Sequence, residues 1–178
     1  MNLKLLLRQR FFERNIVIYY DEIFYFIKYL TGDATVAEDL LQNVMEKAWR
    51  HCHKIKSKKS IKCWLFKIAK NETSSYYKSA YRCSFLEEQI QIKFKDFENL
   101  KQDDVLSALI NIEDTLLLKK ALLLLDRKYL SVILLRYLNE LSFEEISLVL
   151  DINCNTARTN LKRGLNKLKK IYLDLEQN

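Results

Sequence analysis

The chain has 178 residues, enough for one domain or two small ones, and its net charge is +7 at pH 7. It contains no proline and only two glycines, so residues that break helices are almost missing and we expect an all-α fold. The apolar stretches are too short to cross a bilayer, since the leucines at positions 5–7 are followed by Arg8 and Arg10, and we expect a cytoplasmic protein that does not insert into a membrane.

Charge divides the chain into two basic parts around an acidic one. Residues 1–85 contain 16 Lys and Arg against 8 acidic residues, residues 86–118 contain 3 against 8, and residues 119–178 contain 11 against 7. We therefore predict two helical domains, 1–85 and 119–178, joined by a flexible acidic linker, 86–118. Basic domains attract nucleic-acid phosphates, whereas an acidic linker is repelled by them. Within the linker, residues 94–104 show weak periodicity and many charges, which predicts a mobile or irregular segment, with a simple spacer as the alternative.

The cysteines and histidines predict neither disulfides nor a metal site. Cys52, Cys63, Cys83 and Cys154 are scattered without a paired CxxC motif, which is typical of reduced thiols. Histidines flank Cys52, but no second ligand cluster accompanies them, so we expect no metal and no cofactor. The chain also shows no Gly-rich phosphate loop or nucleophile motif, which makes an enzyme the least favoured function class.

The first helices are predicted in residues 11–49. Aromatic residues and isoleucine fill 11–30, which indicates a core-forming segment, and Gly32 is a suitable terminator for it. In the next helix every fourth residue from Val36 to Ala48 is apolar and forms the buried side. Its outward stripe suits either solvent or a basic protein partner, and it contains Asp39, Gln42 and Glu46.

A basic loop at 54–62 (KIKSKKSIK) leads into an amphipathic helix from Trp64 to Arg82. Trp64, Leu65 and Ile68 suit its core side, and tyrosines at 76, 77 and 81 lie close to its polar stripe. Cations interleaved with aromatic rings suit single-stranded DNA, although an aromatic helix is more often part of a core, and both interpretations stay open. The polar stripe contains Lys67, Lys70, Asn71, Ser74 and Lys78.

A helix-turn-helix unit is predicted at 142–170. Ser142 and Glu145 have the spacing of a capping box, the turn covers 151–153, and Asn153 is a suitable cap for the second helix. The second helix has apolar residues at 157, 161, 165 and 168, and its opposite face is polar and basic. Such a face suits the major groove, although an ordinary helical hairpin with a solvated basic face is the alternative. The face contains Asn155, Thr156, Thr159, Lys162, Arg163 and Asn166, with Arg158 on its flank.

Four sequence blocks carry a family resemblance: AEDLLQNVMEKAW, WLFKIAKN, LLLLDRKYLSVILLRYLNELSFEEISLVL and NTARTNLKRGLNKLK. In this order, separated by a basic loop and an acidic linker, they resemble a sigma factor of the extracytoplasmic-function (ECF) type in the sigma-70 family, over nearly the whole chain. The resemblance implies two helical domains, sigma regions two and four. It implies an alternative sigma factor that directs bacterial core RNA polymerase to promoters, without catalysis. The implied partners are core RNA polymerase (beta-prime clamp helices and beta subunit), promoter DNA in duplex and single-stranded form, and an anti-sigma factor.

The resemblance also implies three binding surfaces, and the linker resembles the segment that threads near the polymerase active site, where its negative charge is expected to mimic RNA. The surface implied to dock on the polymerase clamp comprises Ala37, Glu38, Asp39, Leu40, Gln42 and Glu46. The surface implied to recognise and open the minus-10 element comprises Lys56, Lys58, Lys59, Lys62, Trp64, Lys67, Lys70, Asn71, Ser74 and Lys78. The surface implied to read the minus-35 element comprises Asn155, Thr156, Arg158, Thr159, Lys162 and Arg163.

The sequence departs from the family pattern at several positions. Asp126 stands where a Pro often begins region four, and Leu130 stands at the position of a common Arg, so the start of that helix is expected to differ. Lys70 and Ser75 stand where Arg and Asp are common, which alters the charge of the minus-10 helix. Gly164 lies inside the second helix of the helix-turn-helix, where Gly costs up to ~1 kcal/mol relative to Ala, and is expected to lower its stability.

A conventional helix-turn-helix regulator is the alternative function. It would use residues 142–170 on duplex DNA and would need no core polymerase for promoter recognition. That hypothesis leaves the AEDLLQ and WLFKIAKN blocks without a role.

Overall fold

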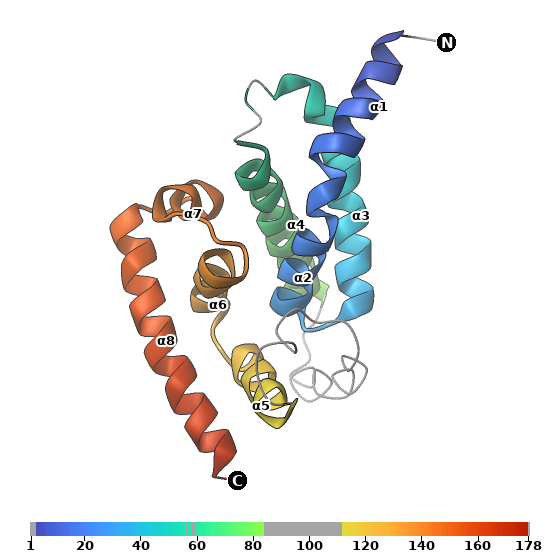
Figure 1. Cartoon of the computed structure of the whole chain (residues 1–178). Coiled ribbons are helices and arrows are strands. Elements are labelled where there is room, and N and C mark those ends of the chain that lie inside the picture. The colour runs from blue at the N-terminus through green and yellow to red at the C-terminus, as the bar shows by residue number, and fades with distance from the viewer. Residues whose placement is uncertain (1–2, 56, 58–59, 84–111, 178) are drawn as a thin grey trace.

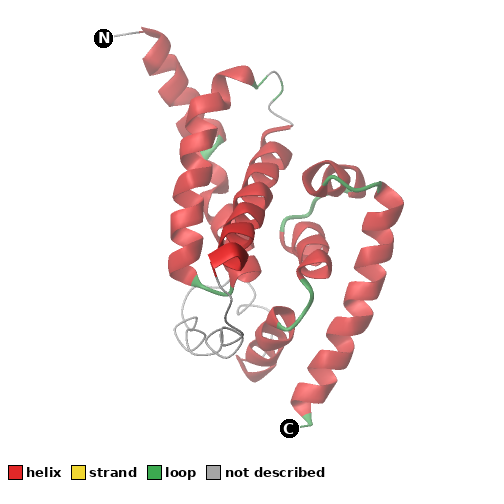
Figure 2. Cartoon of the chain, turned by 180° about the vertical axis from the view of Figure 1, so that it is seen from behind, coloured by secondary structure: helices red, strands yellow, loops and turns green. Residues whose placement is uncertain are grey.

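A computed structural model describes residues 3–55, 57, 60–83 and 112–177 of the chain. Within these residues all regular structure is helical, which confirms the all-α prediction (Figures 1 and 2). Helices α1 to α4 form an N-terminal bundle, and helices α5 to α8 form a C-terminal bundle that lies beside it. Residues 94–104, predicted to be irregular, lie outside the described residues.

The N-terminal bundle packs α2, α3 and α4 around one core. The rings of Phe26 and Phe66 are fully buried there and meet edge to face, with centroids 5.2 Å apart. Helix α1 reaches this bundle near its end, where the Phe12 ring lies 5.3 Å from that of Trp49, and its beginning projects past the bundle (Figure 1). The helices are α1 (Leu3–Asn15), α2 (Tyr20–Thr31), α3 (Ala34–His51) and α4 (Ile61–Cys83), with short 3-10 turns η1 (Val17–Tyr19) and η2 (Cys52–Lys54).

The segment 11–30 is two helices instead of one continuous core segment. Helix α1 ends at Asn15, whose side-chain amide donates a hydrogen bond to the Phe11 carbonyl at 2.8 Å, and β-branched residues at 16–18 follow. Side-chain bonding to the backbone and β-branching both disfavour continuation of a helix. The predicted terminator is confirmed, because Gly32 has a left-handed backbone (φ 72°) and its N–H donates to the Lys28 carbonyl at 2.8 Å.

The C-terminal bundle places α8 on its outer side, with α6 and α7 between α8 and the N-terminal bundle (Figures 1 and 2). Helix α6 continues into a single π-helical segment, η7. Helix α5 begins inside the stretch predicted as linker. The elements are α5 (Ile112–Leu123), α6 (Arg127–Ile133), η7 (Leu134–Leu138), α7 (Phe143–Leu150) and α8 (Cys154–Glu176).

The helix-turn-helix is confirmed at both of its caps. The Ser142 hydroxyl accepts from the Glu145 N–H at 3.2 Å, and the Glu145 carboxylate accepts from the Ser142 N–H at 2.8 Å, which completes the capping box. Helix α7 ends at Leu150, and the next residue, Asp151, caps it with a left-handed backbone (φ 56°). The Asn153 side chain accepts from the Thr156 N–H at 2.7 Å and starts α8.

Gly164 has a packing role that its sequence position did not reveal. Helices α6 and α8 cross at this residue, and a Cβ atom there would lie 2.9 Å from the Cβ of Tyr129 and 3.2 Å from the Cδ1 of Ile133. The missing side chain therefore lets α8 approach α6 closely. The expectation that Gly164 lowers stability considered the isolated helix and omitted this contact. Leu165, assigned to the apolar side of α8, is 36% exposed.

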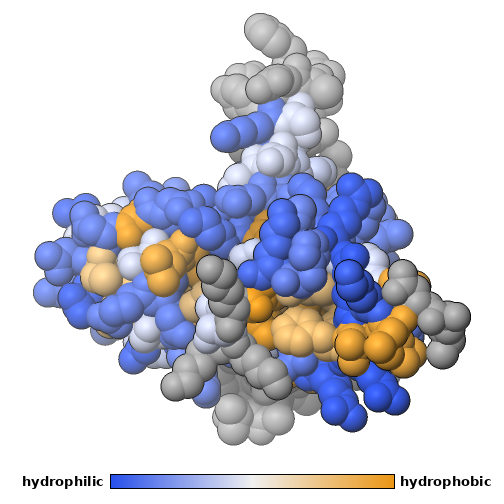
Figure 3. Space-filling view, turned by 90° about the horizontal axis from the view of Figure 1, so that it is seen from above, coloured by the Kyte–Doolittle hydropathy of each residue, from blue (hydrophilic) through white to orange (hydrophobic). Residues whose placement is uncertain are grey.

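Apolar side chains also reach the surface of the N-terminal bundle. Leu3, Leu5 and Leu7 on α1 are 68%, 53% and 58% exposed, and Ile18 on η1 is 63% exposed. Figure 3, which looks at the end of the molecule where the N-terminus lies, shows apolar patches bordered by hydrophilic residues. Scattered exposed apolar residues are normal on a protein surface, so these residues alone do not define a binding site.

Candidate nucleic-acid and protein interfaces

The basic face of α8 is open to solvent. Every residue predicted to read duplex DNA on this helix is exposed except Thr156, which is half-buried beside the cap. The buried side of the helix is defined by Ala157 and Gly164. The exposed residues are Asn155, Arg158, Thr159, Lys162 and Arg163.

Arg158 is oriented by contacts within the helix-turn-helix. Its guanidinium lies 5.0 Å from the centre of the Phe143 ring, 3.4 Å from Oδ1 of Asn155 and 3.7 Å from Oε1 of Glu144. The side chain is still 53% exposed. Because a guanidinium has five N–H donors, these contacts leave donors free for guanine or phosphate. The arrangement suits a recognition helix.

The outward stripe of α3 is also exposed, as predicted. Glu46 forms an ion pair with Arg50, one turn further along α3, and the other members of the stripe face solvent. Ala37 and Leu40, which the resemblance placed on the same surface, are 0% and 7% exposed. They belong to the core and hold the stripe in position. The exposed members are Glu38, Asp39, Gln42 and Glu46.

The polar stripe of α4 is only partly open. Asn71 and Lys78 are exposed, Ser74 is half-buried, and the ring of Trp64 packs against the core. Lys62 lies 2.7 Å from Oε2 of Glu22 on α2, inside its own bundle. The loop residues Lys56, Lys58 and Lys59 lie outside the described residues.

Two lysines of this stripe contact the C-terminal bundle. The Nζ of Lys67 lies 2.6 Å from Oδ1 of Asp151, and the Nζ of Lys70 lies 3.4 Å from Oδ2 of the same carboxylate. Asp151 comes from the turn of the helix-turn-helix. Its pKa is lowered, chiefly by the hydrogen bond from Lys67 and further by Lys70. We call these two contacts the interbundle ion pairs.

A second contact joins α4 to α7 beside the interbundle ion pairs. Cys63 is half-buried and hydrogen-bonds with the side chain of Glu145. Burial and the negative charge of Glu145 raise the pKa of Cys63 to about 11. The pKa of Glu145 is lowered, first by the backbone N–H of Ser142 and to a smaller extent by Cys63. Glu145 therefore serves both the capping box and the contact between the bundles.

A third contact covers Tyr77, which sequence reasoning had placed near single-stranded DNA. The guanidinium of Arg127 lies 3.0 Å from the centre of the Tyr77 ring, and the Tyr77 hydroxyl donates to the Leu30 carbonyl at 2.9 Å. Burial raises the pKa of the Tyr77 hydroxyl. In this arrangement the ring is occupied by Arg127 and does not present a free stacking surface.

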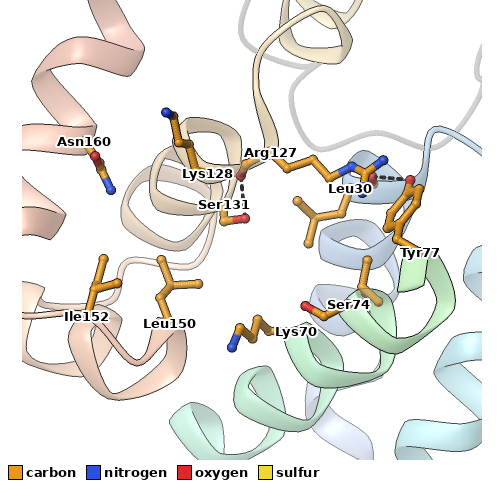
Figure 4. A pocket seen from close by; sticks show the side chains of 11 residues that line it. Leu30, Lys70, Ser74, Tyr77, Arg127, Lys128, Ser131, Leu150, Ile152 and Asn160 are labelled. Carbon is orange, nitrogen blue, oxygen red and sulfur yellow. Dashed lines mark hydrogen bonds between the residues drawn. The ribbon is translucent and has the colours of Figure 1, made fainter. Parts of the chain in front are cut away.

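A cavity of about 230 Å³ lies between the bundles. Figure 4 shows its two sides: Lys70 and Ser74 lie on α4, and Leu150 and Ile152 lie opposite them at the end of α7 and in the turn. Arg127 borders the same space. The part of the α4 stripe near Lys70 therefore faces the helix-turn-helix.

Sequence reasoning missed the C-terminal partners of α4. Asp151 is 84 residues from Lys67 and 81 from Lys70, and it was interpreted only as part of a turn. Glu145 was interpreted only as a capping residue, and Arg127 carried no assignment. Helical periodicity predicts which residues share a face, but it carries no signal for the partner of that face.

Two negative findings apply to the described residues. None of their helices is long and apolar enough to cross a membrane. They also contain no group of three or more His, Cys, Asp or Glu side chains arranged to hold a metal ion. Cys52, Cys63 and Cys154 have free thiols.

The chain matches two family models. Residues 16–83 match Sigma-70 region 2, and residues 115–168 match Sigma-70, region 4. Among curated proteins of Bacillus subtilis (strain 168), the chain is 28% identical to the ECF RNA polymerase sigma factor SigW over 162 residues, covering 89% of this chain and 87% of that protein. It is 30% identical to the RNA polymerase sigma factor SigV over 146 residues, covering 79% of this chain and 77% of that protein.

Two solved structures share the fold. The sigma factor RpoE from Bartonella quintana, in complex with the anti-sigma factor NepR, has a TM-score of 0.69 at 20% identity and covers 90% of this chain and 95% of its own. CnrH in complex with the cytosolic domain of CnrY has a TM-score of 0.66 at 19% identity and covers 93% and 89%. With the two region matches and these relatives, the chain belongs to the sigma-70 family, as an alternative RNA polymerase sigma factor of the ECF type.

Proposed function

We propose that this protein directs core RNA polymerase to promoters by reading the minus-35 element with α8 and the minus-10 element with α4. Its contribution is recognition and strand opening, and the chemistry of RNA synthesis stays with the polymerase. The observation that carries the proposal is the exposed basic face of α8 behind a fully capped turn, in a chain whose two halves match sigma regions two and four.

The α8 face supports binding to duplex DNA. Arg158 and Arg163 can donate to guanine or phosphate, Thr159 can reach a base edge, and Lys162 adds phosphate attraction. All four side chains are exposed on one helix that follows a tight turn. This is the geometry in which a recognition helix enters the major groove.

The α4 stripe supports binding to the melted minus-10 strand. Lys67, Lys70, Asn71, Ser74 and Lys78 form a polar and cationic path along one helix, which suits the phosphates of a single strand. The basic loop before it extends the same charge. We assign Lys56, Lys58, Lys59, Lys62 and Trp64 to this surface as well, with the ring of Trp64 as part of its apolar support.

The α3 stripe supports docking on the polymerase. Glu38, Asp39, Gln42 and Glu46 form an exposed acidic and amide-bearing surface, while Ala37 and Leu40 hold it from the core. A surface of this charge is repelled by DNA and suits a basic protein partner. We assign it to the beta-prime clamp helices of core polymerase, and the C-terminal bundle to the beta subunit.

An anti-sigma factor is the further partner that we propose. The structural neighbour RpoE is a sigma factor bound to the anti-sigma factor NepR, and the neighbour CnrH is bound to the cytosolic domain of CnrY. Both share this fold over most of their length. Since its partners are core polymerase and promoter DNA, we place the protein in the cytoplasm. We assign residues 1–85 and 119–178 to the two DNA-binding domains and 86–118 to the connection between them, the last part of which, from Ile112, is the start of α5 in the C-terminal bundle.

Run-off transcription from a genomic DNA library tests the proposal. Core RNA polymerase is assayed with and without the purified protein, and transcripts are mapped by their 5′ ends. We expect new, discrete start sites preceded by a shared two-part motif. No gain from a folded protein would contradict the proposal and favour a conventional helix-turn-helix regulator that does not need core polymerase.

A further inference from the structure

The interbundle ion pairs place one carboxylate between two lysines of the minus-10 stripe. Each oxygen of Asp151 faces a different ammonium group, with distances of 2.6 Å to Lys67 and 3.4 Å to Lys70. A carboxylate that accepts from two ammonium groups presents the same kind of charge and acceptors as a backbone phosphate. The contact therefore fills the positions that a DNA strand would use on α4.

The surrounding contacts show that the ion pairs belong to a larger interface. Glu145 hydrogen-bonds with Cys63 one turn before Lys67, and Arg127 covers Tyr77 further along the same helix. Contacts therefore extend along α4 from its first turns to Tyr77, on the side that faces α6 and α7. DNA cannot occupy this side of α4 while the C-terminal bundle lies on it.

We propose that the free chain inhibits itself, because Asp151 occupies Lys67 and Lys70 in place of a promoter strand and so holds the C-terminal bundle against the minus-10 face. The identity of the displaced ligand rests on the proposed function, whereas the closed arrangement rests on the contacts alone. Opening of the two bundles is then a required step before the melted strand binds.

The exposure of the ion pairs makes this closure reversible. The side chains of Asp151, Lys67 and Lys70 are 55%, 42% and 26% exposed, and exposed pairs contribute modestly because solvent screens them. We expect their loss to change the closed-to-open ratio roughly threefold to tenfold. Binding to core polymerase and DNA can offset a contribution of this size.

Asp151→Asn is a selective way to remove the ion pairs. Asp151 has a left-handed backbone, and Asn adopts that conformation as readily as Asp, so the turn is kept while the charge is lost. The matched control is Asp126→Asn. Asp126 is also an exposed aspartate bound to a lysine, at 2.8 Å from Lys167, but both partners lie in the C-terminal bundle.

Cys63 provides a built-in measure of opening. Its thiol is half-buried at the interface, and burial together with Glu145 raises its pKa to about 11, which suppresses the reactive thiolate. Opening removes Glu145 and exposes the thiol. The alkylation rate of Cys63 by iodoacetamide, measured by peptide mass spectrometry on the full chain, therefore reports how often the bundles separate.

We expect Cys63 to be alkylated roughly threefold to tenfold faster in Asp151→Asn than in the unchanged protein. In Asp126→Asn the alkylation rate of Cys63 should equal that of the unchanged protein. An unchanged rate in Asp151→Asn would overturn the inference. In the second arm, each protein binds a fluorescent single-stranded oligonucleotide that carries the minus-10 sequence found in the run-off assay. The affinity of Asp151→Asn should rise by the same factor as the alkylation rate, because more of the chain is competent to bind.

The two arms separate failure of the inference from failure of the proposed function. Faster alkylation without any gain in oligonucleotide affinity would overturn the competition between Asp151 and DNA. If run-off transcription with core polymerase fails for every variant, the proposed function is wrong. The oligonucleotide must then be chosen without a known minus-10 sequence. The alkylation result tests the closed arrangement in either case.

Discussion

The basic faces of α8 and α4 are built from the same kinds of side chain but differ in what surrounds them. On α8, Arg158 and Arg163 are exposed, and the contacts of Arg158 come from its own helix-turn-helix. On α4, Lys67 and Lys70 are bound to Asp151 of the other bundle. Under the proposals above, the α8 face is ready to bind DNA in the free chain, and the α4 face becomes available only after the bundles separate.

The difference in exposure affects the order in which the minus-35 and minus-10 elements are expected to bind. A face that is already exposed can form an encounter complex with duplex DNA without a conformational change. A face that is covered binds with an apparent affinity reduced by the closed fraction. We therefore expect minus-35 recognition to precede capture of the melted strand, which matches the order in which duplex and single-stranded DNA become available.

The greatest effect is expected from the double substitution Arg158→Ala with Arg163→Ala, which tests whether the exposed basic face of α8, here called the open face, binds promoter DNA. Each specific contact of Arg with a base is worth ~1–3 kcal/mol, so together they should reduce promoter-specific run-off transcription by roughly 100-fold. Core polymerase affinity should be unchanged. The matched control is Lys169→Ala with Lys170→Ala, which removes two exposed cations about two turns beyond Lys162 and Arg163 and outside the predicted minus-35 contacts. Full transcription from the Arg double variant would remove this face from the promoter site.

The position of the open face depends on Gly164. Gly164→Ala places a Cβ within 2.9 Å of Tyr129 and forces α8 away from α6, so we expect a loss of ~1–3 kcal/mol in the free energy of unfolding. Urea denaturation followed by circular dichroism measures it. Asn166→Ala, two residues further along the exposed side of α8, is the control and should be neutral or slightly stabilising. A stabilised Gly164→Ala protein would mean that helix propensity outweighs packing at this crossing.

The fold was largely predictable because its signals are local. Capping by Ser142 and Asn153, termination at Gly32 and the four-residue step from Val36 to Ala48 depend on neighbouring residues. The break at 16–18 was not predicted, because a dense apolar segment gives the same pattern whether it is one helix or two.

The binding faces were predictable only as patterns of exposure. The outward stripe of α3 and the basic face of α8 were correctly predicted to be exposed, because amphipathic periodicity determines which side is buried. The partner of Lys67 and the packing role of Gly164 were not predicted, since both depend on residues that are distant in the sequence. The roles of these faces in binding stay predictions until the variants are measured.

The acidic stripe of α3 is an exposed face like that of α8, but its proposed partner is core polymerase instead of DNA. Asp39→Lys reverses a charge within the stripe and should weaken binding to core polymerase about tenfold, or 1.4 kcal/mol. Affinity is measured by fluorescence anisotropy with labelled protein. Glu13→Lys on α1, an exposed acidic residue outside the stripe, is the control and should retain affinity. Equal affinity for Asp39→Lys and the unchanged protein would exclude this stripe from the docking surface.

Glu145 takes part in the capping box of α7 and in the contact with Cys63 on α4, so we expect the stability of the protein to depend on the ionisation of Glu145. Its pKa is lowered in the folded protein, so its stabilising contribution is complete above the ordinary value near 4.5 and is lost as pH falls through the lowered pKa. Glu145→Gln keeps an acceptor for the Ser142 N–H but carries no charge. Between pH 6 and pH 3 the unfolding free energy of the unchanged protein should fall more steeply than that of the variant, by up to ~1 kcal/mol. Parallel pH profiles would contradict the assignment.

The smallest effect concerns salt. The Debye length falls from ~8 Å at 0.15 M to ~3 Å at 1 M, which weakens exposed pairs such as Lys67 with Asp151. The Cys63 alkylation rate of the unchanged protein should therefore rise about twofold to threefold over this range. The rate in Asp151→Asn should change less. A rise of equal size in both proteins would show that salt acts through another contact.

Photo-crosslinking in the open promoter complex tests the account most directly. Benzoylphenylalanine is placed at Asn71 on α4 or at Thr159 on α8, two exposed positions on the two faces, and the complex is assembled with core polymerase and a promoter found by run-off transcription. The account predicts that the probe at 71 crosslinks to the non-template strand of the minus-10 element and that the probe at 159 crosslinks to the minus-35 duplex. Crosslinks from both positions to one element, or to no DNA at all, would contradict it.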